Sequence, residues 1–204
     1  MLSSKDNKEK LFLSFDIESD GPTPMINNLL SIGIVGITID EKIVFEYEAN
    51  IEPLVTHVQD NQCMQTFWLK PEQKIAWEHL QTNRRNYIEV FEDLGIKLKE
   101  LNNQYKLKFV AHPACFDWMF LKCYYELAKL NSKNKEYFYD IGYQCECSST
   151  LFNFYKQSNK LSSQQANKLF KEWGEFDENS NHMALSDATV QGKFYIKLLK
   201  KIAI

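Results

Sequence analysis

Four acidic residues and one histidine occur in three separate segments, and their types suit metal-dependent hydrolysis. Asp16 and Glu18 are separated by one residue at the end of an apolar run. Side chains at positions i and i+2 of a strand point to the same face, so these two carboxylates would converge. Asp117 follows a second apolar run, and Asp187 lies five residues after His182. Carboxylate oxygens are the ligands that hard divalent cations prefer, and we therefore expect a metal site.

Each of these segments also has a simpler interpretation. Asp16 and Glu18 could form a solvated strand end. Asp117 could be stabilised by the positive end of a helix dipole, and His182 could be a capping or solvated loop residue. Any one segment taken alone favours the simpler interpretation, and the hypothesis of a common site rests on the three occurring together.

The hydrophobic pattern predicts the elements that would position these residues. The closing helix would begin between His182 and Asp187, which would let the two side chains converge. A loop is expected over residues 20–28, and the order of elements predicts an α/β fold with a mixed five-stranded sheet flanked by helices. The strands are expected over residues 11–17, 29–39, 43–51, 106–111 and 137–141, and the helices over residues 71–80, 85–101, 115–130, 148–156, 162–173 and 184–202.

The composition predicts one domain over residues 11–204, preceded by a flexible segment over residues 1–10. The chain has 204 residues, of which 44% are hydrophobic, and this is enough for one substantial core. The formal net charge of −3 neither favours nor excludes nucleic acid. The five cysteines include no CxxC pair, and neither a secretory signal nor a membrane-spanning run is visible. We expect a cytoplasmic protein with reduced cysteines and no membrane association.

Three motifs together resemble those of the DEDDh exonucleases, the family of polymerase proofreading subunits, ribonuclease T and oligoribonuclease. The motifs are FDIESDGP at residues 15–22, AHPACFDWMFL at residues 111–121 and HMALSDA at residues 182–188. The resemblance implies a ribonuclease H-like fold and a 3′-5′ exonuclease that releases nucleoside 5′-monophosphates by a two-metal mechanism. Two departures concern substrate details: Pro113 stands where relatives often carry Asn, and Ser19 where they often carry Thr.

The resemblance also implies a role for each site residue. Asp16 would contact both of two divalent ions, Mg²⁺ or alternatively Mn²⁺. Glu18 and Asp187 would complete the shell of one ion, and Asp117 would hold the other. His182 would accept a proton from the attacking water, since an imidazole titrates near neutral pH.

The expected partner is a nucleic acid with a free 3′ end, for which a single strand is favoured and a short duplex end stays open. The candidate substrate-binding residues are Ser19 and Asp20, in the loop after the first strand, and the aromatic residues Phe67, Trp68, Phe116 and Trp118. Aromatic side chains can stack on bases of any sequence. The choice between DNA and RNA stays open, as does a possible homodimer. Two alternative functions are an inactive nucleic-acid-binding or scaffold module on the same fold, and a nucleotide phosphohydrolase.

Overall fold

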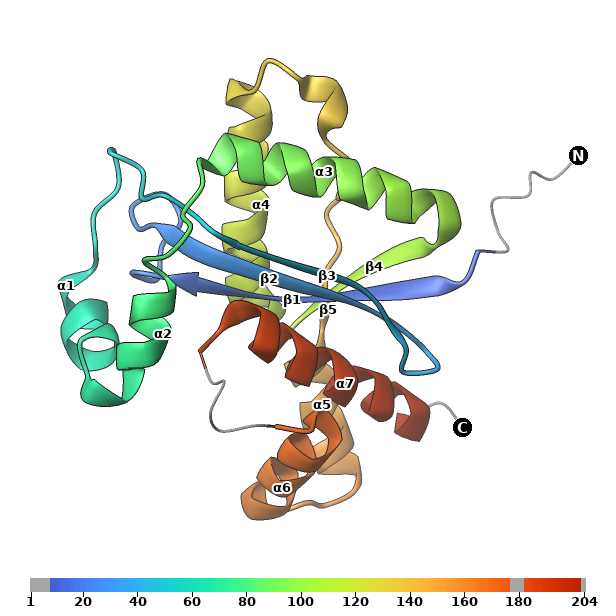
Figure 1. The fold of residues 1–204 in the computed structure, drawn as a ribbon. Helices are drawn as coiled ribbons and strands as arrows, with labels where there is room; N and C mark the ends of the chain where they lie inside the picture. The colour runs from blue at the N-terminus through green and yellow to red at the C-terminus, as the bar shows by residue number, and fades with distance from the viewer. Residues whose placement is uncertain (1–7, 177–181, 203–204) are drawn as a thin grey trace, which may run out of the picture.

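The core of the protein is a mixed five-stranded sheet with the strand order β3-β2-β1-β4-β5 (Figure 1). The computed structural model describes residues 8–176 and 182–202. β1 pairs antiparallel with β2, and β2 pairs antiparallel with β3. β4 is parallel to both β1 and β5. The strands are β1 (Lys10–Ser19), β2 (Leu29–Thr38), β3 (Ile43–Asn50), β4 (Lys106–Ala111) and β5 (Glu146–Cys147).

Helices cover both faces of the sheet (Figure 1). One face carries α3 (Tyr87–Gln104) and α4 (Ala114–Asn131), and the other carries α5 (Ser148–Ser158), α6 (Ser163–Gly174) and α7 (Ala184–Ile202). A smaller helical excursion lies beyond the end of β1 and contains α1 (Asn61–Cys63), a π-helical turn (Met64–Trp68), a 3-10 turn (Pro71–Gln73) and α2 (Lys74–His79). A further 3-10 turn covers Lys135–Tyr137. The α/β class and the flanked five-stranded sheet are therefore confirmed.

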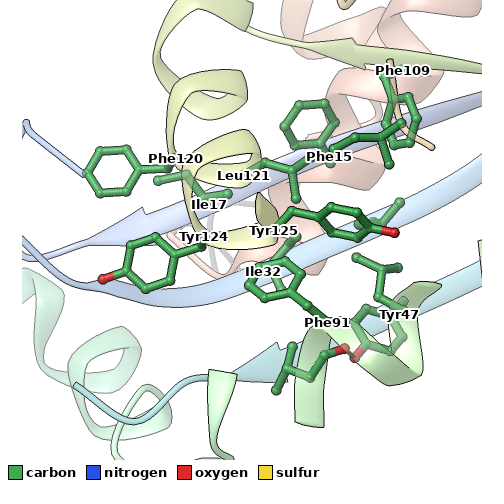
Figure 2. Packing of buried hydrophobic residues seen from close by; sticks show 14 of the residues in the cluster. Phe15, Ile17, Ile32, Tyr47, Phe91, Phe109, Phe120, Leu121, Tyr124 and Tyr125 are labelled. Atoms are coloured by element: carbon green, nitrogen blue, oxygen red, sulfur yellow. Dashed lines mark hydrogen bonds between the residues drawn. The ribbon is translucent and has the colours of Figure 1, made fainter. Parts of the chain in front are cut away.

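The alternation of side chains along β1 divides the core into two layers. Leu11, Leu13, Phe15 and Ile17 belong to the large cluster against α3 and α4, part of which Figure 2 shows. Phe12 points to the other face and packs with residues of α7. Alternate residues of a strand point to the same face of the sheet, so Asp16 and Glu18 lie on the same face as Phe12, toward α7.

The predicted fifth strand at residues 137–141 is wrong. The Tyr125 hydroxyl of α4 donates to the Tyr139 carbonyl (2.9 Å) and accepts from the Tyr139 N–H (2.8 Å). Phe138 and Ile141 are buried in the large cluster, which explains why this segment is apolar. A tyrosine thus satisfies the backbone here, and the fifth strand forms later, where Glu146–Cys147 pairs with β4.

Two other expectations need correction. Residues 61–68 are helical although no helix was predicted there; Asp60 caps the first turn by accepting from the Cys63 N–H (2.6 Å). The flexible segment expected over residues 1–10 is too long, because Lys10 already belongs to β1 and the Glu9 carbonyl accepts from the Lys106 N–H. Residues 1–7 lie outside the described residues. In the described part of the chain, no helix combines the length and the apolar character that crossing a membrane requires.

Candidate active site

The structure brings the four acids together at one edge of the sheet. Asp16 and Glu18 come from the end of β1, and Asp187 comes from the first turn of α7. Asp117 lies in the first turn of α4, and the Ile17 backbone, between the two β1 acids, helps to stabilise its charged form. Three segments that are far apart in the sequence thus supply one cluster of acidic side chains.

A glycine in β2 allows the start of α7 to approach the sheet. Gly33 is the register partner of Asp16. A Cβ atom at Gly33 would lie 2.1 Å from the Leu185 backbone nitrogen and 2.2 Å from the Ala184 carbonyl carbon. These distances are far shorter than van der Waals contact, so no other residue fits without moving α7. Gly33 therefore places Asp187 and the preceding loop beside Asp16.

Burial and mutual repulsion make the charged forms of these acids costly. Burial, followed by repulsion from Asp117 and from the neighbouring acids, holds the pKa of Asp16 well above its usual range. Glu18 is shifted in the same direction, by burial and then by Asp187 and Asp117. Burial raises the pKa of Asp117 to about 7 and that of Asp187 to about 6. Within residues 8–176 and 182–202, none of the four forms a salt bridge.

His182 lies directly against the acids. One ring nitrogen of His182, one oxygen of Glu18 and one oxygen of Asp187 are within 4.8 Å of one another. The His182 backbone N–H donates to Asp187 Oδ2 (2.9 Å), and its φ of 61° is in the left-handed region. Its imidazole meets the Phe67 ring edge-on at a centroid distance of 4.8 Å. Burial lowers the pKa of His182, which favours the neutral imidazole that can accept a proton.

The donor set fits hard divalent cations. All four acids offer oxygen ligands, and none is neutralised by a cationic side chain of the described residues. Asp117 is only 3% exposed, and its Oδ2 has no hydrogen-bond partner within the described residues. A buried carboxylate oxygen without a partner is destabilising unless a cation or a proton meets it. The cluster is therefore a suitable site for one or more divalent ions.

Three of the six candidate substrate-binding residues make structural contacts within the chain. Asp20 is fully buried, and its carboxylate accepts from the Asn28 backbone (2.6 Å) and from Asn28 Nδ2 (2.7 Å). Trp68 is 2% exposed and donates from Nε1 to the Ser19 carbonyl (2.8 Å). The Ser19 hydroxyl donates to the Gly21 carbonyl (2.8 Å). These contacts close the loop after β1 and attach the helical excursion to it.

The other three candidates are half-buried aromatic side chains. Phe67 contacts His182, as described above. Phe116 packs on Phe120 at a centroid distance of 5.2 Å. Trp118 packs against Phe15 and Phe109, at 6.1 and 5.5 Å. Their partial exposure leaves contact with a substrate open.

Gln191 is a site residue that we did not predict from the sequence. It lies one helical turn after Asp187 in α7, and its Nε2 donates to Asp16 Oδ1 (2.7 Å). The available signal was the spacing of four residues, which places both side chains on one face of the helix. Pro113 is the N-cap of α4, and its carbonyl accepts from the Phe116 N–H (3.2 Å).

The mixed sheet with acids from three segments has the architecture of the DEDDh exonuclease domains. The nuclease domain of 3′hExo, described as a DEDDh family member bound to rAMP, has a TM-score of 0.59 and 14% identity, with 96% of this chain and 94% of that chain covered. Cell-death related nuclease 4 (CRN-4) has a TM-score of 0.58 and 12% identity, over 95% and 64% of the two chains. The E. coli ExoI–ssDNA complex has a TM-score of 0.62 and 10% identity, over 96% and 41%.

These low identities establish a shared fold, and a family model defines the chain more closely. Residues 11–199 match the model of the Rv2179c-like 3′-5′ exoribonuclease domain. The chain belongs to this family. The match includes all four acids and His182. No curated protein matches the sequence.

Proposed function

We propose that the protein is a 3′-5′ exonuclease that acts on RNA and releases nucleoside 5′-monophosphates one at a time. The observation that carries the proposal is the convergence of Asp16, Glu18, Asp117 and Asp187 beside His182. The family, described as 3′-5′ exoribonuclease domains, supports both the direction of cleavage and the choice of RNA.

Two divalent cations, Mg²⁺ or Mn²⁺, would supply the positive charge that phosphodiester hydrolysis needs at the attacking water and at the leaving oxygen. Asp16 is repelled by each of the other three acids, and it would hold both ions. Glu18 and Asp187 would hold one ion with Asp16, and Asp117 would hold the other. The raised pKa values support a bound cation, since it would stabilise the charged carboxylates that burial disfavours in all four acids and that repulsion between the acids further disfavours in Asp16 and Glu18.

His182 would serve as the general base of the reaction. Burial lowers the pKa of His182 and so favours the neutral imidazole, whose unprotonated ring nitrogen would accept the proton of the attacking water. The hydrogen bond from its backbone to Asp187 ties the base to the acid cluster. The edge contact with Phe67 holds the ring against the excursion that follows β3.

The substrate end would be an unpaired 3′ terminus. Structures with the same fold are described with rAMP, with a histone mRNA stem-loop and with ssDNA, and these support a nucleic-acid ligand in this site. Phe67, Phe116 and Trp118 stay candidates for stacking on terminal bases. A homodimer stays a prediction that analytical ultracentrifugation would test.

The test is a time course on RNA and DNA oligonucleotides labelled at the 5′ or the 3′ end, with Mg²⁺, Mn²⁺ or EDTA. We expect a ladder of 5′-labelled RNA shortened stepwise, early release of the 3′ label as a mononucleotide, slower cleavage of DNA, and no cleavage in EDTA. Asp16→Asn is the matched inactive control because it preserves shape and removes charge. Shortening from the 5′ end would contradict the proposal, as would release of phosphate from free nucleotides without cleavage of oligonucleotides.

A further inference from the structure

Gln191 is buried between α7 and the end of β1, where it contacts Asp16. The side chain is 7% exposed, and its Nε2 donates to Asp16 Oδ1 at 2.7 Å. We propose that Gln191 is a positioning residue that orients the Asp16 carboxylate for the divalent ions. This inference rests on the proposed function, because it assigns Gln191 a role only if Asp16 binds metal.

Stability of the fold does not explain an amide at this position. Oε1 of Gln191 is buried and has no hydrogen-bond partner in the described part of the chain. A buried carbonyl without a partner destabilises the folded state. The amide cannot reverse to relieve this, because its oxygen would then face an oxygen of Asp16. An apolar side chain of the same shape would avoid the unpaired oxygen, so the hydrogen bond to Asp16 is the evident reason for an amide.

A neutral donor suits this position better than a cationic one. Asp16 is already repelled by Asp117, Glu18 and Asp187. A lysine or arginine here would form an ion pair with Asp16 and compete with the divalent cations for its charge. The Gln191 amide occupies one acceptor position of Oδ1 and adds no charge. A carboxylate has about four such positions, so the others stay available to ions while the orientation of the group is held.

The test measures metal affinity separately from turnover. Mn²⁺ is titrated into the wild-type protein, Gln191→Met and Gln191→Asn by isothermal titration calorimetry, and the melting temperature of each protein is measured in EDTA. Methionine preserves the approximate shape and removes the donor, and asparagine retains the amide but is one methylene too short. Loss of a partner that orients a metal ligand typically weakens binding roughly 10–100-fold. We expect a loss of that size in both variants, with a melting temperature in EDTA that is unchanged or higher for Gln191→Met.

Ser14→Ala is the matched control. Ser14 lies on the same face of β1 as Asp16, is fully buried, and has an Oγ with no partner within the described residues. Its removal should leave the Mn²⁺ affinity unchanged.

The outcomes separate this inference from the proposed function. Wild-type protein that binds no Mn²⁺ would refute the metal site itself. Wild-type protein that binds Mn²⁺, together with a folded Gln191 variant of equal affinity, would overturn the role of Gln191 alone. An equal loss in Ser14→Ala would show that any change in this layer disturbs the site, and would also overturn it. If Gln191→Met does not fold, Gln191→Asn decides the question.

Discussion

Two roles are open to the imidazole of His182, because a ring nitrogen lies within 4.8 Å of oxygens of both Glu18 and Asp187. As a general base it would accept a proton, and as a ligand it would help to hold a cation. If it is the base, His182→Ala should lower turnover roughly 10²–10⁴-fold and leave the affinity for Mn²⁺ close to that of the wild type. Single-turnover cleavage and calorimetry measure the two quantities. An affinity that falls as far as in Asp187→Asn would identify His182 as a ligand.

The contact between Phe67 and His182 suggests that Phe67 positions the base. Leucine in place of Phe67 would remove the ring edge that supports the imidazole. We expect kcat to fall while KM for a short RNA changes little. If Phe67 instead stacks on a base, a contact worth about 1–3 kcal/mol, KM would rise. Phe154→Leu, which changes an exposed phenylalanine of α5, is the matched control.

At the scale of elements, the approach of α7 to β2 decides whether the site forms. Gly33→Ala places a Cβ 2.1 Å from the Leu185 backbone, so the start of α7 must move away from Asp16. Overpacking of this kind costs roughly 1–3 kcal/mol, which corresponds to a drop in melting temperature of about 2–12 °C for a protein of this size. We expect activity per folded molecule to fall as well, and thermal melts with activity assays at a permissive temperature would show both effects.

Gly36→Ala on the same strand provides the comparison. Its Cβ would lie 2.9 Å from the Phe45 side chain and 3.2 Å from the Leu11 side chain, away from the acids. This substitution should lower the melting temperature and leave the activity of the folded molecules close to that of the wild type. Equal losses of activity in the two variants would contradict the special role of Gly33.

For the whole molecule, the acid cluster links stability to pH. The folded-state pKa values of Asp117 (about 7) and Asp187 (about 6) lie above the value of 3.8 for a free carboxyl, and Asp16 and Glu18 are shifted in the same direction. At pH values between the unfolded-state and folded-state pKa values, these acids bind more protons in the folded state than in the unfolded state. The contribution of these groups to the free energy of unfolding therefore decreases as pH rises from about 4 to about 7.

Divalent cations should restore the free energy of unfolding that is lost as pH rises. The effect should be larger at high pH, because protons compete with the cations for the same carboxylate oxygens. At a cation concentration about 100 times the Kd, binding adds about 2.7 kcal/mol, or roughly 5–11 °C in melting temperature. Melts with Mg²⁺ or EDTA at pH 8 and pH 5, at matched ionic strength, measure the effect. The shift should be larger at pH 8 and should disappear in the Asp117→Asn, Asp187→Asn double variant. An equal shift at both pH values would contradict the linkage.

Local patterns in the sequence were sufficient for much of the architecture. The predicted bounds of β4 (106–111) and of α7 (184–202) agree with the structure, because each is an uninterrupted run of one periodicity. The spacing of two residues between Asp16 and Glu18 on a strand was enough to place both carboxylates on one face of the sheet. The grouping of the acids was predictable because their order along the chain matched a family pattern.

Contacts between distant segments decided the rest. The sequence did not predict that Asp20 accepts hydrogen bonds from Asn28 or that Trp68 donates to the Ser19 carbonyl. The segment 137–141 is apolar like a strand, yet a tyrosine of α4 satisfies its backbone. Gln191 reaches Asp16 across 175 residues of sequence. Hydrogen-bond partners at such separations follow from how helices pack on the sheet, and no local pattern records that packing.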